Sequence, residues 1–94
     1  MEADLKYYFK SLGFSDADIQ NLAQIEPALN IIDYKHAMDN IMLVVNFGYP
    51  MEDIDSLISI NPSFLALSLQ ELQTSLTAIG GNVEQALKDD PFLI

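Results

Sequence analysis

Two stretches of this sequence share one pattern and decide the expected fold: GFSDADIQNLAQIEP at residues 13–27 and GYPMEDIDSLISINP at residues 48–62. They lie 35 positions apart, and their alignment matches a glycine-aromatic pair, an Asp-Ile pair, a leucine, an isoleucine and a proline. In the first stretch these residues are Gly13, Phe14, Asp18, Ile19, Leu22, Ile25 and Pro27. Self-similarity at this period is typical of proteins built from stacked helical repeats.

The first stretch predicts the end of one helix and the whole of a second. Apolar residues recur at three- and four-residue steps before Gly13, and this glycine can end the helix in a left-handed cap. Ser15 and Asp18 resemble a capping box that opens a helix over residues 16–25, and Pro27 ends it because proline has no N–H. The expected buried faces consist of Leu5, Tyr8, Phe9 and Leu12 in the first helix and of Ile19, Leu22, Ala23 and Ile25 in the second.

The second stretch follows a helix predicted over residues 34–47. This helix is apolar on more than one side and is therefore expected to be the most buried of the fold. Gly48 ends it, Pro50 lies near the first turn of the next helix, and Asn61 with Pro62 ends that helix. The expected buried residues are Ala37, Met38, Ile41, Met42, Val44 and Val45, followed by Ile54, Leu57 and Ile58.

A shorter and weaker third copy follows. Ser68 and Glu71 form a second predicted capping box, residues 80–81 break the helix that it opens, and Asn82 caps a last helix over residues 83–88. The expected stripe of the longer helix is Leu69, Leu72, Leu76 and Ile79.

No segment shows the alternation typical of a strand. The sequence therefore predicts one all-α domain over residues 1–94, a compact stack of short helices built from two or three repeats of about 35 residues. The expected units span residues 5–32, 37–66 and 68–94.

The repeated residues resemble a known family. Residues 12–15 and 47–49, together with Pro27 and Pro62, are similar to the helical repeats of the mitochondrial transcription termination factor family. This resemblance implies helix triplets stacked around a continuous core, and nucleic acid binding through a basic concave surface. Residues 76–87 also resemble the last two helices of ubiquitin-associated domains, which implies ubiquitin binding.

The charge of the chain restricts its partners. It carries 14 Asp and Glu against 4 Lys, has no arginine, and has a net charge of −10. Because nucleic acid backbones are held by clustered Lys and Arg, this balance disfavours direct nucleic acid binding and places that activity third among the possible functions. The chain has no cysteine, so we expect no disulfide and no thiolate site. The acidic start and the lack of an apolar run of about 20 residues predict a soluble cytoplasmic protein that does not enter the membrane.

No motif predicts an enzyme, and no cofactor or metal is expected. His36 lies three residues before Asp39, but no nucleophile motif surrounds it, so a surface or packing role is favoured over that of a base. Glu52, Asp53 and Asp55 lack the alternating ligands and the central glycine of a calcium loop, and instead place negative charge at a helix start.

Two hypotheses about function remain. The first is a non-enzymatic interaction module, or adaptor, whose acidic surface binds a basic partner protein. The alternative is an inhibitor of the anti-CRISPR or phage type that mimics nucleic acid and blocks a nucleic-acid-binding protein. Because the acids are dispersed over several helix starts, the first is favoured. The expected partner-binding residues are Asp16, Asp18, Glu52, Asp53 and Asp55, with Tyr7 and Tyr49 as amphipathic anchors.

Overall fold

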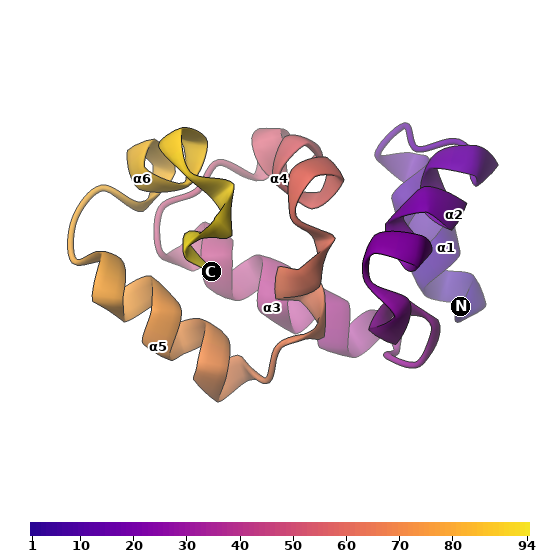
Figure 1. Cartoon of the computed structure of the whole chain (residues 1–94), viewed down its shortest axis with the longest axis horizontal. Coiled ribbons are helices and arrows are strands. Elements are labelled where there is room, and N and C mark those ends of the chain that lie inside the picture. Colours follow the sequence, from indigo (N-terminus) through magenta and orange to yellow (C-terminus); the bar gives the residue numbers. More distant parts are fainter.

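The long helix α3 runs through the middle of the computed structural model, which describes residues 1–94, and the other elements lie around it (Figure 1). The six α-helices are α1 (Ala3–Ser11), α2 (Asp16–Ile25), α3 (Tyr34–Asn46), α4 (Ile54–Ile60), α5 (Leu69–Ile79) and α6 (Val83–Asp89). Four short 3₁₀ helices join them: η1 (Pro27–Asn30), η2 (Met51–Asp53), η3 (Pro62–Ala66) and η4 (Pro91–Leu93). There is no strand, so the prediction of an all-α fold is confirmed.

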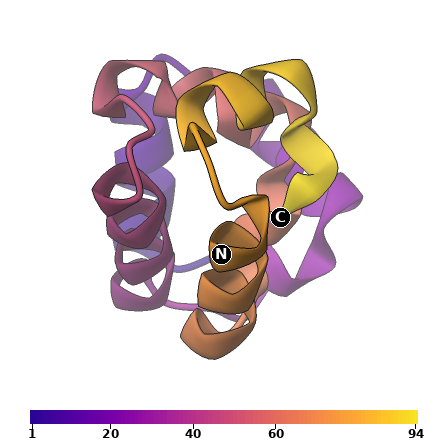
Figure 2. The same ribbon diagram turned by 90° about the vertical axis from the view of Figure 1, so that its left-hand side faces the viewer.

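The elements follow one another along the longest of three dimensions of 35 × 23 × 19 Å. Helices α1 and α2 lie at one end, α5 and α6 lie at the other, and α4 lies between them (Figure 1). Viewed from the end formed by α5 and α6, the helices surround the centre of the molecule (Figure 2). Pro27, Pro62 and Pro91 each open a 3₁₀ helix after a short α-helix. None of the helices combines the length and the apolar character needed to cross a membrane.

Each of the first two glycine-aromatic pairs ends a helix in the same way. The amides of Gly13 and Phe14 donate to the carbonyls of Lys10 and Phe9, over 3.0 and 3.2 Å. These two bonds make a Schellman motif, in which the residue after the helix takes a positive φ angle. The rings of Phe9 and Phe14 pack edge to face with centroids 6.1 Å apart, which closes the turn. The second turn repeats both hydrogen bonds, from Gly48 to Val45 and from Tyr49 to Val44.

The third glycine turn differs from the other two. Gly80 has a positive φ angle of 68°, but its amide and that of Gly81 make neither of the two Schellman bonds. The third segment, residues 68–94, therefore has the same order of helix, glycine turn, helix and proline-led 3₁₀ helix as the first segment. It lacks the hydrogen bonds that close the first two glycine turns.

Replacing Gly48 by alanine tests the role of its backbone conformation. Its φ angle is +115°, and a Cβ atom added there would meet no atom within 4 Å, so the cost is that of the backbone alone. We expect G48A to lower the free energy of unfolding by about 1–2 kcal/mol, measured by urea denaturation. G81A is the matched control, because Gly81 has open space but no positive φ, and it should leave stability unchanged or slightly raised. Equal effects of the two variants would contradict this explanation.

The core consists mainly of residues that the repeat pattern predicts to be buried, but the prediction is wrong for three residues, which are exposed. Ile25, Met42 and Leu69 are 60%, 40% and 46% exposed. Ile25 ends α2 and Leu69 begins α5, so both lie where no neighbouring element covers the helix, and Met42 lies on the uncovered face of α3. After Leu22, the next core residue along the chain is the fully buried Leu29 of η1, and not the predicted Ile25. The buried residues that the pattern predicts correctly are Leu5, Phe9, Ile19, Leu22, Ala37, Ile41, Val44, Ile54, Leu57, Ile58, Leu72 and Leu76.

A buried amide holds η3 against α3. Asn40 in α3 is fully buried. Its Nδ2 donates to the carbonyl oxygens of Phe64, Leu65 and Leu67, at 2.9, 3.1 and 2.8 Å. Nε2 of His36, one turn earlier, lies 2.8 Å from the same Leu67 oxygen. The two side chains together therefore join α3 to the segment that leads into α5.

A second buried asparagine does the same at the chain end. Asn61, 4% exposed, donates through Nδ2 to the carbonyl oxygens of Pro91 and Ile94, at 2.9 and 3.2 Å. A short 3₁₀ helix leaves several carbonyls without a partner in the main chain, and buried carbonyls are rarely left unpaired. The two asparagine amides satisfy such carbonyls in η3 and around η4.

Replacing Asn40 by alanine should be costly. N40A leaves up to three carbonyl oxygens without their donor, so we expect a loss of about 1–3 kcal/mol in the free energy of unfolding. N40D should cost at least as much, because a carboxylate would face those oxygens without donating to them. The exposed Asn46 on the same helix is the control, and N46A should change stability by less than about 0.5 kcal/mol. A neutral N40A would refute this role for the amide.

Candidate functional site

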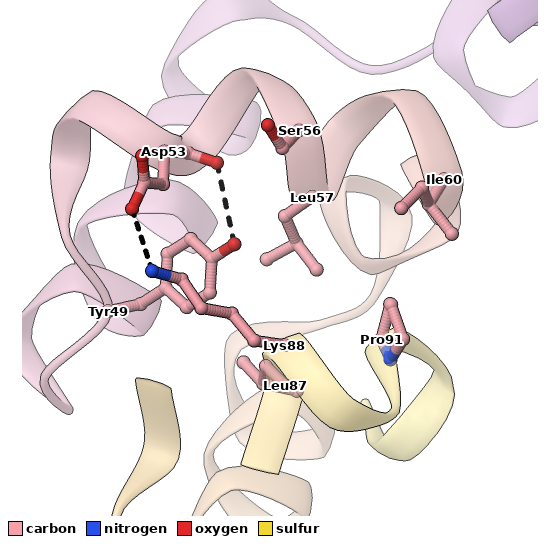
Figure 3. Close-up of a pocket in the computed structure, with 8 residues that line it drawn as sticks. All are labelled: Tyr49, Asp53, Ser56, Leu57, Ile60, Leu87, Lys88 and Pro91. Carbon is pink, nitrogen blue, oxygen red and sulfur yellow. Dashed lines mark hydrogen bonds and ion pairs between the residues drawn. The ribbon is translucent and has the colours of Figure 1, made fainter. Parts of the chain in front are cut away.

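A cleft of about 300 Å³ opens between α4 and α6 (Figure 3). Tyr49, Asp53 and Lys88 lie at one end of it, and Ile60 and Pro91 lie at the other. The lining residues are Tyr49, Asp53, Ser56, Leu57, Ile60, Leu87, Lys88 and Pro91. The cleft thus has a polar end and an apolar end.

The apolar end is formed by the core and by one exposed side chain. Leu57 and Leu87 are each 1% exposed and form the floor, so the cleft lies directly on the core. Ile60, the last residue of α4, is 51% exposed, and Pro91 of η4 faces it across the opening (Figure 3). An apolar side chain entering here would contact apolar atoms on both walls.

The polar end is an ion-pair network centred on Lys88. Its Nζ lies 2.9 Å from Oδ2 of Asp53 in η2 and 2.8 Å from Oε2 of Glu84 one turn earlier in α6. The hydrogen bonds that Lys88 donates to the carboxylates of Glu84 and Asp53 raise its pKa well above the usual range of lysine. The side chains of Lys88 and Asp53 are 42% and 39% exposed, so a partner can reach both.

Tyr49 lies beneath this network. It is 4% exposed, and its hydroxyl donates to the main-chain carbonyl of Asp53 at 3.4 Å. Burial raises the pKa of the Tyr49 phenol; the positive charge of Lys88 opposes this rise, and the nearby carboxylates, among them Asp55, add to it. The phenol therefore remains protonated at neutral pH.

These groups are suited to binding more than to proton transfer. Lys88 is held as a cation and Tyr49 as a neutral phenol, so neither is poised to act as a base or nucleophile near neutral pH. The chain brings no three potential metal ligands of the His, Cys, Asp or Glu type together. The arrangement offers an apolar surface bordered by carboxylates and by one lysine that is already neutralised.

The two acidic residues predicted in the first repeat serve structural purposes. Asp16 lies 2.9 Å from Nζ of Lys10 and 3.8 Å from Nζ of Lys6, which ties the start of α2 to α1. The hydrogen bond from Lys10 is the main cause of its lowered pKa. Asp18 accepts a hydrogen bond from the amide of Ser15 in the predicted capping box, which is confirmed. Both carboxylates are exposed.

The three acidic residues predicted in the second repeat take different positions. Asp53 pairs with Lys88 at the cleft, whereas Glu52 and Asp55 have neither a hydrogen bond nor an ion pair within the chain. The α-helix begins only at Ile54, after the short η2, so the predicted helix start near Pro50 is too early. Pro50 instead precedes η2, and Glu52 and Asp53 are two of the three residues of η2.

The two predicted tyrosine anchors differ in their exposure to solvent. Tyr7 on α1 is 76% exposed, as an anchor requires. Tyr49, the second predicted amphipathic anchor, is only 4% exposed and lies in the lining of the cleft.

The sequence interpretation missed Lys88, Ile60 and Leu87 as lining residues. A signal for Lys88 was present, since it is the only cationic residue after Lys35 in a strongly acidic chain, and such a residue is expected to be surrounded by carboxylates. No comparable signal marks Ile60, whose exposure depends on how α4 packs against α6.

All four lysines are engaged within the chain. Besides the pairs of Lys6, Lys10 and Lys88, Nζ of Lys35 lies 2.7 Å from Oδ2 of Asp39. Most of the 14 acidic residues also have a partner, either a lysine or a hydrogen-bond donor. The acidic residues without a partner are Asp4, Glu52 and Asp55.

Comparison with models of known protein families, with curated proteins and with solved structures finds no match to this chain. The cleft is therefore interpreted from its own geometry and charge.

The Lys88 network can be tested through its salt dependence. K88Q leaves Asp53 and Glu84 without their cation, so we expect a lower Tm at low ionic strength and a smaller difference from the parent chain in molar salt. Because the pKa of Lys88 is raised in the folded chain, its contribution is complete below the ordinary lysine pKa of about 10.4 and is lost only as the pH rises further, so the comparison belongs at neutral pH. K35Q, which removes a single exposed pair, should have the smaller effect. A salt-independent loss in K88Q would show that packing of its stem matters instead.

Proposed function

We propose that the chain is a small, non-enzymatic interaction module that binds a protein partner with a basic surface, and that the cleft between α4 and α6 receives an apolar side chain of that partner. The observation that carries the proposal is the combination, in one cleft, of the exposed Ile60 over an apolar floor with the carboxylate of Asp53 at the other end. Exposed apolar surface bordered by polar groups is typical of binding sites.

The charge of the surface supports a basic partner. Every lysine is already paired with a carboxylate, so the chain has no unpaired cationic side chain to attract an anionic surface. Glu52 and Asp55, on either side of Asp53, have no partner within the chain and can pair with a cation from outside at little desolvation cost. Opposite charges at such a rim mainly increase the rate of association and select the partner.

The distribution of the acids supports a module over a mimic of nucleic acid. A mimic requires carboxylates that project outward in a phosphate-like array, whereas many of these carboxylates accept hydrogen bonds from main-chain amides at helix starts. Glu2, for example, accepts the amide hydrogen of Tyr34, the first residue of α3, at 2.9 Å. These carboxylates contribute to the negative field, but their positions follow from capping.

Titration of the ¹⁵N-labelled chain with a cationic helical peptide that carries one leucine among lysines tests the proposal. We expect the amide signals of Ser56, Ile60 and Lys88 to shift, and binding to weaken with salt. I60D should weaken binding at least tenfold, because a carboxylate would replace the apolar wall. I31D is the matched control, since Ile31 is 85% exposed and does not line the cleft, and it should bind like the parent chain.

A second pair of measurements separates the apolar contact from charge. A peptide in which the leucine is replaced by alanine should bind more weakly at every salt concentration, whereas E52Q combined with D55N should weaken binding only at low salt. Equal binding of the leucine and alanine peptides would contradict the role of the cleft. Preferential capture of a nucleic-acid-binding protein that duplex DNA displaces would favour the mimic instead.

A further inference from the structure

A second hollow, of about 360 Å³, lies between α1 and the start of α3 and is lined by tyrosines. Asp4, Tyr7, Tyr8 and Ser11 contribute to it from one face of α1, because residues three and four apart share a helix face. Tyr34, the first residue of α3, forms the opposite side. We call these five residues the tyrosine corner.

Two rings of the tyrosine corner stand at a steep angle to each other. The ring centroids of Tyr8 and Tyr34 are 5.9 Å apart, and their planes make an angle of 65°. Tyr8 is half-buried, Tyr34 is 36% exposed, and Tyr7 is 76% exposed, so the corner is open to solvent. The hydrogen bond from the Tyr34 amide to the carboxylate of Glu2 links the start of α3 to the start of α1, which positions the Tyr34 ring against α1.

The five residues that line the tyrosine corner include no cation. Asp4 has no partner within the chain, and the Ser11 hydroxyl donates to the Tyr8 carbonyl of its own helix, so it does not donate into the corner. Lys6 and Lys10 of α1 both pair with Asp16 of α2 and do not line the corner. The negative charge of Asp55 also reaches the corner, since it contributes to a raised pKa of Tyr8 whose main cause is burial.

We propose that the tyrosine corner binds an organic cation of the alkylated ammonium class. The faces of aromatic rings attract cations, and angled tyrosines beside a carboxylate are the arrangement that recognises ammonium groups carrying methyl substituents. The methyl groups would contact the faces of Tyr8 and Tyr34, and the carboxylate of Asp4 would balance the charge. An anion would meet only ring faces and carboxylates. This site is separate from the cleft between α4 and α6 and does not depend on the function proposed for that cleft.

Choline and its uncharged isostere 3,3-dimethylbutan-1-ol provide the direct test. The two molecules have nearly the same shape, so only the cation should move the aromatic ring signals of Tyr8 and Tyr34 in NMR spectra of the labelled chain. We expect the isostere to bind at least tenfold more weakly. Equal binding of the two molecules, or no movement of either ring signal with choline, would overturn the proposal.

Matched variants test the assignment to these side chains. Y34F keeps the ring and should bind choline like the parent chain, whereas Y34L and D4N should each weaken binding by about threefold to tenfold. F92L is the control, since Phe92 is 66% exposed in η4 and lies outside the corner. The amide spectrum of each variant reports whether it is folded, so a folded Y34L that binds choline as well as Y34F does would overturn the assignment.

Peptides distinguish the two sources of such a cation. Tighter binding of a peptide with trimethyllysine than of choline supports a methylated side chain of a protein as the ligand. Equal or weaker binding than choline supports a free small cation. Equal binding of the trimethyllysine peptide and its unmethylated counterpart would contradict recognition of an alkylated ammonium group.

Discussion

The arrangement of the helices depends on one side-chain amide, that of Asn40. Helix α3 contacts elements of all three segments of the chain, and at its middle a polar residue occupies a position that helical periodicity would give to an apolar one. The amide satisfies main-chain carbonyls of η3 and of Leu67, which no regular helix would pair. Because these carbonyls lie just before α5, the same bonds determine where α5 begins relative to α3. A leucine at this position would fill the space but would leave the carbonyls without their donor, which costs free energy.

The parts of this fold that could be predicted from sequence are those governed by local interactions. Both predicted capping boxes form, and Asn82 caps α6 as expected, because each cap depends on residues only three positions apart. The left-handed glycines could be predicted for the same reason. The 3₁₀ helices after Pro27 and Pro62 could not, since nothing local distinguishes such a turn from a loop. Their stability comes from partners far away in the chain, and Asn40 and Phe64 are 24 residues apart.

The candidate site could be predicted in its charge but not in its shape. Glu52, Asp53 and Asp55 were recognised as an acidic group, and the structure places Asp53 at the cleft and leaves the other two unpaired. The burial of Tyr49 does not follow from its place in the repeat, since the equivalent Phe14 of the first Schellman turn is only partly buried. Ile60 was not recognised because a single isoleucine at a helix end is as compatible with the core as with a surface. Only the packing of α6 beside α4 makes it one wall of a cleft.

The charge of the chain has two separable consequences for binding. The four lysines are consumed in internal pairs, so the surface field is set by carboxylates and extends over about one Debye length, roughly 8–10 Å at physiological salt. That field brings cationic groups toward both the cleft and the tyrosine corner and does not distinguish one cation from another. Selection therefore has to come from the short-range contacts, which are an aliphatic wall in the cleft and aromatic faces in the corner. Salt weakens the attraction by this field far more than the contact with the aliphatic wall of the cleft, since contact between apolar surfaces is not screened. In the two proposals, the acidity of this chain therefore acts on the rate at which a cationic ligand arrives, and the two hollows act on which ligand is retained.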